Sequence, residues 1–261
     1  MTNAFINSFQ SEWLKRKRSL ASWLVLVGAL FTPLIMLLVR MKNYDKLAPL
    51  YTAEDFWEKL WNQSCESMMV FLLPMGIILA TGLVTQIEYK NNTWKQLHTT
   101  PQRFATIFFA KLLVIVVLMI ALFVFYNISL YLSAVIPAFL LADVPYPTEP
   151  INYPHFFNEN LKFFVDSLPI LALQYLISLQ FKNFMVPIGT GFMIWMLGIG
   201  LVSWKYSYIF PYVYTAIDHF ISSGHMTGER LPMSVQLIAL GYFAIFTIAG
   251  YILYATKKEK G

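Results

Sequence analysis

The sequence predicts an all-α integral membrane protein with six transmembrane helices. Hydrophobic residues make up 57% of the 261 residues, charged residues make up 13%, and the mean hydropathy is +0.57. One soluble core cannot bury that much apolar surface, so lipid must be the solvent for most of the chain. Two further observations set the number of crossings: the lengths of the apolar stretches and the uneven placement of basic residues.

Six stretches are long and apolar enough to cross a bilayer, which takes a helix of about 20 residues. They are residues 20–39, 68–87, 104–136, 161–181, 184–202 and 235–255. The third is too long for one perpendicular crossing, so it tilts, begins as an interfacial helix near Phe104, or continues outside past Pro137. Only Lys182 and Asn183 separate the fourth and fifth stretches. If residues 180–190 form one buried helix, the chain has five spans and its ends lie on opposite sides.

The distribution of basic residues favours six spans over five. With six spans and the N-terminus inside, the inner segments carry twelve of the 19 basic residues and three of the 14 acids, which leaves +9 inside and −4 outside. The twelve are Lys15, Arg16, Lys17, Arg18, Lys90, Lys95, Arg103, Lys111, Lys182, Lys257, Lys258 and Lys260. Because cytoplasmic loops are enriched in Lys and Arg, both termini are predicted to be cytoplasmic, in an inner or plasma membrane. The isoelectric point near 9.1 therefore reflects topology and indicates no nucleic-acid partner.

One helical face before the first span carries Phe5, Phe9 and Trp13, which recur every four residues. Four basic residues follow at positions 15–18. This pattern predicts a helix over residues 1–19 that lies in the inner membrane interface. The alternative is a disordered basic tail.

An aromatic stripe precedes the second span. Residues 52–55 have the form of a helix capping box with Asp in place of Glu. Phe56, Trp57, Leu60 and Trp61 follow at helical spacing. We expect a short helix on the outer leaflet whose tryptophans are interfacial anchors, in preference to substrate contacts.

Proline, cysteine and glycine add local constraints. The segment after the third span contains Pro137, Pro145, Pro147, Pro150 and Pro154. That density predicts an extended segment. Cys65 is expected in an outer loop as an unpaired packing residue, with intermolecular pairing as the alternative. The last two spans contain Gly189, Gly191, Gly198, Gly200, Gly241 and Gly250. Glycines let helices approach closely in lipid, and we expect packing within one subunit in preference to a dimer seam.

The sequence lacks the motifs of an enzyme. It contains no Gly-Lys dipeptide, so it has no P-loop to hold ATP phosphates, and we expect no catalytic residues, no metal site and no cofactor. The four histidines, at positions 98, 155, 219 and 225, all lie outside the predicted spans. Asp166 is predicted within a turn or two of the outer end of the fourth span, and no acid pair is expected to be buried. The charged relay of an ion-coupled transporter is therefore missing from the predicted spans.

Neutral polar side chains do occur within the predicted spans. Asn127 and Ser133 belong to the third, and Gln174 and Ser178 to the fourth. These four residues either line a transport path or form hydrogen bonds between helices.

Residues 88–103 form a connector between the second and third spans that is longer than a simple turn requires. Trp94 and Leu97 stand among polar residues, and Thr100-Pro101 suits the end of a short helix. An exposed Trp and Leu flanked by polar groups predict a docking surface for a partner protein. The alternative is that Trp94 anchors in the inner headgroups.

Two segments give the chain a resemblance to type-2 ABC exporter permeases. Residues 12–19 resemble the elbow helix that opens those proteins. The connector and the next span resemble theirs at Glu88, Thr93, Leu97, Thr100, Pro101, Arg103 and Lys111. The resemblance extends to chain length and span order, and it implies a single transmembrane permease domain over residues 1–261 with the type-2 ABC exporter fold.

In that family a short cytoplasmic coupling helix joins the membrane subunit to an ATPase. The resemblance therefore implies ATPase coupling by Glu88, Thr93, Trp94, Leu97, Thr100, Pro101 and Arg103. It also implies separate ABC ATPase subunits, a dimer with a second copy or a paralogue, and short re-entrant helices within residues 204–234, where hydropathy alone also fits an interfacial loop. In its size and its lack of a fused ATPase, the chain resembles the antimicrobial-peptide immunity and export subgroup of these permeases. That resemblance implies a peptide or other amphipathic substrate. A non-transporting membrane scaffold or sensor is the alternative function.

Overall fold

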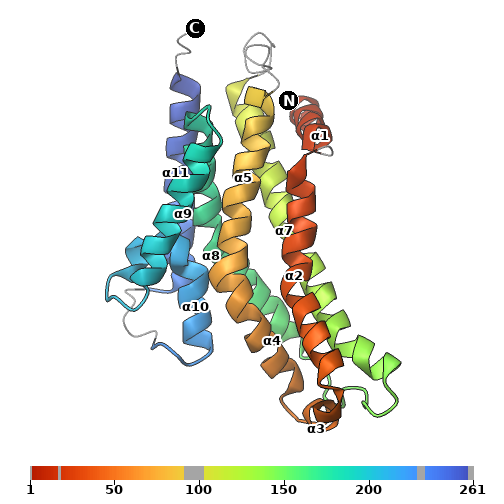
Figure 1. Ribbon diagram of the computed structural model, residues 1–261. Helices are drawn as coiled ribbons and strands as arrows, with labels where there is room; N and C mark the ends of the chain where they lie inside the picture. The colour runs from red at the N-terminus through yellow and green to blue at the C-terminus, as the bar shows by residue number, and fades with distance from the viewer. Residues whose placement is uncertain (1, 17–18, 91–102, 228–232, 258–261) are drawn as a thin grey trace.

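The computed structural model is an elongated bundle of helices, with no strand in the residues that it describes, which are 2–16, 19–90, 103–227 and 233–257 (Figure 1). In chain order the elements are α1 (Thr2–Arg16), α2 (Leu20–Lys42), η1 (Tyr44–Lys46), α3 (Leu47–Tyr51), α4 (Phe56–Ser67), η2 (Met68–Leu72), α5 (Leu73–Lys90), α7 (Phe104–Leu140), α8 (Tyr153–Gln180), α9 (Met185–Gly200), η3 (Ser207–Ile209), η4 (Pro211–Val213), α10 (Tyr214–Ser222) and α11 (Val235–Thr256). An all-α fold is therefore confirmed.

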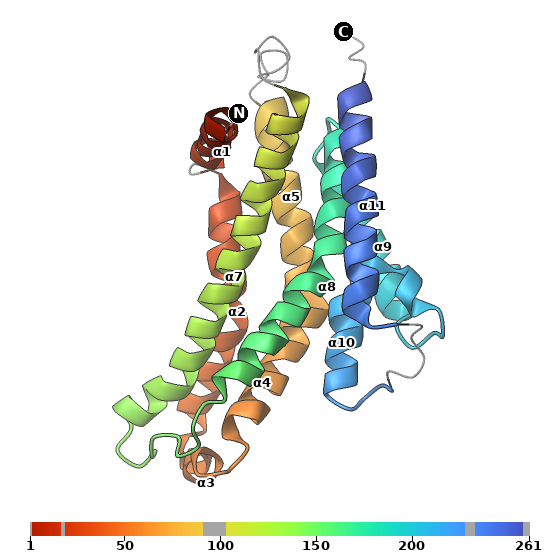
Figure 2. The same cartoon turned by 180° about the vertical axis from the view of Figure 1, so that it is seen from behind.

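The beginning and the end of the described chain lie at the same end of the bundle (Figures 1 and 2). This end holds α1, the end of α5, the start of α7 and the end of α11. We call it the proximal end, and we call the opposite end, which holds α3, the distal end. The chain thus returns to the side from which it starts, as six passes require.

Five helical stretches are long and apolar enough to span a membrane. They are Leu20–Lys42, Phe56–Ile87, Phe104–Leu140, Tyr153–Gln180 and Val235–Thr256. The apolar helix α9 has 16 residues and rises about 24 Å, less than the thickness of a typical hydrocarbon core. The chain breaks between α8 and α9 at residues 181–184, where the Met185 amide donates to Asn183 Oδ1 at 3.0 Å. The predicted turn is confirmed, so one helix over residues 180–190 is wrong.

The third pass, α7, is one continuous helix of 37 residues, which is about 56 Å long. It begins after Arg103, whose carbonyl oxygen accepts from the Thr106 amide at 2.9 Å. The helix runs past Pro137 to Leu140. Of the three predicted alternatives, continuation past the proline is the one found. Figure 2 shows the distal part of α7 leaning away from the bundle.

The fourth pass, α8, begins at Tyr153 instead of residue 161. The side chain of Asn152 caps the helix by accepting from the His155 amide at 3.3 Å. Pro154 falls in the first turn, where its missing N–H costs no helical hydrogen bond. The proline-rich stretch is therefore extended only between α7 and Asn152, and its last proline starts a helix.

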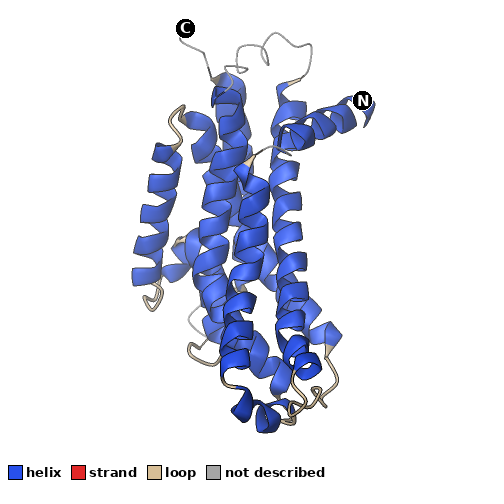
Figure 3. Ribbon diagram, turned by 45° about the vertical axis from the view of Figure 1, so that its right-hand side comes forward, coloured by secondary structure: helices blue, strands red, loops and turns tan. Residues whose placement is uncertain are grey.

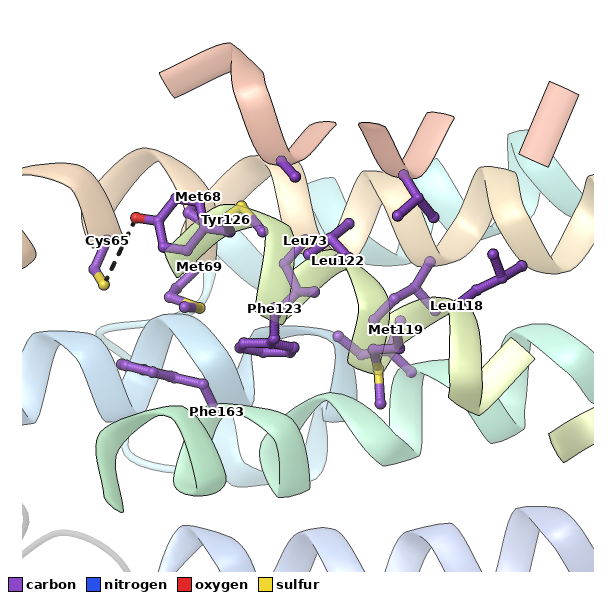
Figure 4. Packing of buried hydrophobic residues seen from close by; sticks show 14 of the residues in the cluster. Cys65, Met68, Met69, Leu73, Leu118, Met119, Leu122, Phe123, Tyr126 and Phe163 are labelled. Carbon is purple, nitrogen blue, oxygen red and sulfur yellow. Dashed lines mark hydrogen bonds between the residues drawn. The ribbon is translucent and has the colours of Figure 1, made fainter. Parts of the chain in front are cut away.

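The second pass is the continuous helical stretch α4–η2–α5, in which η2 is a π-helical turn. Cys65 lies on α4, so the prediction that it belongs to a loop is wrong. Its thiol is free and fully buried, which confirms unpaired packing. The Tyr126 hydroxyl lies 4.0 Å from the sulfur (Figure 4).

The aromatic stripe of α4 is buried inside the protein, and its predicted place on the outer leaflet is wrong. Phe56, Trp57, Leu60 and Trp61 are at most 7% exposed. Trp57 stacks on Tyr131 of α7 with ring centroids 5.9 Å apart. The stripe faces protein because α4 continues directly into a membrane-crossing helix. The predicted capping box is also absent, because Asp55 makes no side-chain cap bond and pairs with Lys59 at 2.7 Å.

The hydrophobic core lies between α5, α7 and α8. Figure 4 shows side chains from α4, η2, α5, α7 and α8 packed together: Cys65, Met68, Met69, Leu73, Leu118, Met119, Leu122, Phe123, Tyr126 and Phe163. On the two flanks of this core, α2 packs along α7 and α11 packs along α8. The five long helices are thus held as one body.

Short helices fill the chain between α9 and α11. Tyr214, Thr215 and Ile217 of α10 are buried, and the Thr215 hydroxyl donates to the Met69 carbonyl at 2.7 Å. Residues 207–222 therefore form short helices, and the alternative of a loop is wrong for them. That they re-enter the membrane, as the family resemblance implies, stays a prediction.

Candidate coupling end and transport-path residues

The connector leaves and re-enters the bundle at the proximal end. Glu88 belongs to the last turn of α5, and the exposed Arg103 immediately precedes α7. Thr93, Trp94, Leu97, Thr100 and Pro101 lie outside the described residues, as does the side chain of Glu88. Their role in coupling, and the alternative of a headgroup anchor for Trp94, stay predictions.

The N-terminal helix α1 lies across the proximal end of the bundle (Figure 3) and packs on α7. Phe5, Phe9 and Trp13 are half-buried, and the rings of Phe9 and Trp13 stack with centroids 5.9 Å apart. The Arg16 guanidinium lies 3.6 Å from the centroid of the Trp13 ring. A helix is thus present where the sequence predicted one, and a disordered tail is wrong for residues 2–16.

A buried ion pair joins α1 to α7. Lys111 Nζ lies 3.8 Å from Glu12 Oε2, and the two side chains are only 2% and 6% exposed. The other carboxylate oxygen of Glu12 accepts from Lys15. A buried charge is costly unless it is paired, so this contact fixes α1 at a definite place on α7. Lys111 is about two helical turns from the start of α7, so the elbow is attached close to the connector.

Two of the predicted path residues, Asn127 and Ser133, belong to α7. Asn127 exchanges two hydrogen bonds with Asn160 of α8, at 2.8 and 3.1 Å. The Ser133 hydroxyl donates to the Leu130 carbonyl of its own helix at 2.7 Å. Asn127 therefore joins two helices, whereas the hydrogen bond of the Ser133 hydroxyl stays within α7.

Gln174 of α8 is fully buried and bridges three elements. Its Nε2 donates to the Pro187 carbonyl of α9 at 2.7 Å, and its Oε1 accepts from the Tyr212 hydroxyl of η4 at 2.7 Å. Ser178, one turn further along α8, is 1% exposed, and among the described residues its hydroxyl has no hydrogen-bond partner. A path-lining role for these four polar residues stays a prediction.

A cavity of about 380 Å³ lies between α4, α7 and the start of α8. Its lining is mostly aromatic and aliphatic, and consists of Trp57, Leu60, Trp61, Asn127, Ile128, Leu130, Tyr131, Ile151, Tyr153 and Phe156. Asn127 is thus a predicted path residue that reaches a cavity, on the distal side of the molecule.

The chain matches the family described as ABC-2 family transporter protein over residues 8–198. This range covers more than two thirds of the chain, from within α1 to the last turn of α9. The chain belongs to the ABC-2 family of transporter proteins. No curated protein matches the sequence.

The ABC-2 protein is therefore a multi-pass membrane permease, and the type-2 ABC permease resemblance is confirmed at the level of the family. The family match includes the second half of the elbow, the flanks of the connector and the polar residues of α7 and α8. It ends before η3, so α10 and α11 lie beyond it. Because it distinguishes no subgroup, an antimicrobial-peptide substrate stays a prediction.

The expectation that no acid pair is buried is wrong for this ABC-2 protein. Asp166 of α8 is fully buried, Asp218 of α10 is half-buried, and both accept from Gln236 Nε2 of α11, at 3.3 and 3.2 Å. Because α8 begins at Tyr153, Asp166 lies about 20 Å along the helix from its distal end. Within the described part of the chain, no group of three or more His, Cys, Asp or Glu side chains forms a metal site.

Proposed function

We propose that this ABC-2 protein is the permease subunit of an ATP-driven exporter, which forms the translocation path and couples to separate ATPase subunits through residues 88–103. The observation that carries the proposal is the position of the connector's flanks. The end of α5 and the start of α7 share the proximal end with α1 and the end of α11. A connector that emerges from the spans at this end is placed to contact a partner outside the membrane.

The elbow gives the connector a mechanical link to the rest of the bundle. Movement of the connector by an ATPase would act directly on α5 and α7. The buried pair of Lys111 with Glu12 would then carry movement of α7 into α1. A switch between inward-open and outward-open states needs such rigid links between packed elements, and here ATP binding to the partner would bias the two states.

The placement of charge supports a cytoplasmic proximal end. Arg103 and Lys111 lie at the start of α7, and Lys257 Nζ donates to the Leu179 carbonyl near the end of α8 at 2.8 Å. Lys15 and Arg16 close α1 at the same end. Because Lys and Arg concentrate on the cytoplasmic side, we propose that both termini face the cytoplasm across an inner or plasma membrane.

The exposed helices support a dimer. In the most apolar 18-residue windows of α2 and α11, only 22% and 17% of the residues are buried. These faces must contact lipid, a second copy or a paralogue. Membership of the ABC-2 family supports a dimeric permease that uses such faces, and the aromatic cavity with Asn127 on its wall favours a peptide or other amphipathic substrate.

The test of this function is purification of the tagged full chain from its own cells in mild detergent, followed by identification of the proteins that remain bound. We expect an ABC ATPase in the complex and ATP hydrolysis that depends on it, because the chain itself has no P-loop. If no ATPase binds under conditions in which the permease stays folded, the protein is instead a non-transporting scaffold or sensor.

A further inference from the structure

Three polar side chains from three different elements meet between α8, α10 and α11. Gln236 Nε2 donates to Asp166 Oδ2 at 3.3 Å and to Asp218 Oδ1 at 3.2 Å. Both accepting oxygens are therefore within 6.5 Å of each other, because they share one nitrogen atom.

The second oxygen of each carboxyl group is buried without a hydrogen bond. Asp166 Oδ1 and Asp218 Oδ2 have no partner in the described part of the chain, and Asp166 as a whole is fully buried. A carboxylate out of water normally needs several donors to stay ionised. Here one amide group serves two carboxyl groups, so each lacks most of the compensation that its charge would require.

The surrounding groups do not neutralise a double negative charge. On α8, Lys162 precedes Asp166 by about one turn, but it donates to Glu159 at 2.7 Å, so its charge is shared with a third acid. On α10, burial lowers the pKa of the His219 imidazole, so that side chain is neutral at neutral pH. Glu66 at the end of α4 and Glu159 add further negative charge to this region.

Two like charges this close in a low-dielectric site cannot both be ionised at little cost. We propose that Asp166 and Asp218 form a proton-binding pair that retains one proton at neutral pH, with Gln236 as the amide that holds both carboxyl groups in place. The proton comes from water, and the pair then carries one negative charge instead of two. The pair titrates as a unit, so the proton belongs to both residues.

The proton-binding pair also sets how α10 is attached. Its two carboxyl groups come from α8 and α10, while the amide comes from α11. One retained proton keeps these three elements in contact. Loss of that proton would place two repelling charges across the α8–α10 contact and loosen α10. Burial raises the pKa of the Asp218 carboxyl above its ordinary value, which agrees with this direction.

The test is infrared spectroscopy of the purified full chain in lipid nanodiscs at neutral pH. A protonated carboxyl group has a C=O stretching band that is distinct from the carboxylate bands and shifts in D₂O. We expect such a band in the parent protein, a shift of the band in each of Asp166→Asn and Asp218→Asn, because the remaining carboxyl group loses its neighbouring acid, and loss of the band in the double Asn variant. Glu54→Gln, at an exposed position, is the matched control and should keep the band.

Two kinds of result would contradict the proposed proton-binding pair. A parent protein without the band, a band that is the same in the parent and in both single Asn variants, or a band that persists in the double Asn variant would mean that the pair holds no proton. Asn is a neutral isostere of the protonated acid, so both variants should fold. If neither variant inserts and folds while Glu54→Gln does, ionised carboxylates are required at this site and the proposal is overturned.

Discussion

Lys111 forms an ion pair that is almost completely removed from solvent, in contrast to that of Lys59. Lys111 is 2% exposed and pairs with Glu12, which is 6% exposed. Lys59, in contrast, is 62% exposed and pairs with Asp55, which is 50% exposed. Removing one partner of a buried pair leaves an uncompensated charge, whereas an exposed pair contributes little to stability.

Lys111→Met should therefore destabilise the folded permease by up to about 3 kcal/mol, because Glu12 would lose its partner on α7. The matched variant Lys59→Met should change stability by less than about 0.5 kcal/mol. Thermal unfolding of both variants in the same detergent, followed by intrinsic fluorescence, measures the difference. Equal unfolding temperatures for Lys111→Met and the parent would show that the pair does not fix α1 on α7.

The Asp218 carboxyl predicts a pH dependence of stability. Its pKa in the folded protein is raised above the unfolded value of about 3.9. The folded state therefore binds more protons than the unfolded state above that pH, and stability falls as pH rises. Asp218→Asn removes this contribution, so its unfolding temperature should fall less steeply between mildly acidic and mildly alkaline pH than that of the parent. Parallel curves for parent and variant would contradict the assignment.

The proximity of Asp166, Asp218 and Gln236 could not be predicted from the sequence. Gln236 lies 70 residues from Asp166 and 18 from Asp218, and no motif links them. Hydropathy placed Asp166 near a membrane surface because it placed the start of the fourth span eight residues too late. Capping by Asn152 and a proline in the first turn set the real start, and these are local effects that an apolar window does not register.

At the level of elements, the contact of α8 with α9 depends on a glycine. A Cβ atom built on Gly191 would lie 2.5 Å from Gln174 Oε1 and 3.1 Å from Ile78 Cγ1. Gln174 cannot move aside freely, because both ends of its amide are hydrogen-bonded, to Pro187 and to Tyr212. A Cβ at Gly189, in contrast, would meet nothing within 4 Å.

Gly191→Ala should consequently destabilise the permease by about 1–3 kcal/mol, because it forces Gln174 away from its partners. Gly189→Ala on the same helix should be tolerated or slightly stabilising, since alanine favours helix over glycine. Thermal unfolding of the two variants in one detergent gives the comparison. A loss of stability in Gly189→Ala as large as that in Gly191→Ala would show that the close approach of α9 to α8 is not the cause.

The sequence predicts well those elements that have a clear helical period of apolar residues or a clear polar break between two helices. The elbow appears as α1 because Phe5, Phe9 and Trp13 share one face, and the break after α8 falls at the two predicted polar residues. The stripe on α4 was misplaced because an amphipathic period shows that a helix has an apolar face but not whether lipid or protein covers it. Only the packing of Trp57 on Tyr131 decides that question.

In the molecule as a whole, an even number of membrane passes brings the two chain termini to the same end of the bundle. The same end of the bundle holds α1, the end of α11 and both flanks of the connector. Asp143 follows the end of α7, which lies at the distal end of the bundle. If the proximal end is cytoplasmic, both termini and the connector lie inside the cell and Asp143 lies outside.

Cysteine labelling in intact cells tests this topology. In a background in which Cys65 is replaced by Ser, Lys258→Cys should be protected from an impermeant thiol reagent, and Asp143→Cys should be labelled from outside. Permeabilised cells should allow labelling of both variants, which controls for reactivity. Labelling of position 258 in intact cells would contradict a topology in which both termini are cytoplasmic.

Residues 88–103 are proposed to dock an ATPase. The most direct measurement is the amount of ATPase that co-purifies with a Trp94→Ala, Leu97→Ala double variant, compared with a control of the same chemistry, Trp23→Ala with Leu26→Ala. The control residues have the same spacing and lie exposed on α2, where they are 67% and 37% accessible. Size-exclusion profiles show that each permease is folded.

We expect the connector double variant to lose its ATPase, because truncating a docking Trp and Leu removes on the order of 2–4 kcal/mol of binding free energy. The α2 control should retain the parent amount. Glu88→Gln should lower coupled ATP hydrolysis with less loss of the complex, since an acid at the end of α5 orients the connector. If the Trp94→Ala, Leu97→Ala variant holds its ATPase as tightly as the parent, residues 88–103 are not the docking element and Trp94 is a headgroup anchor.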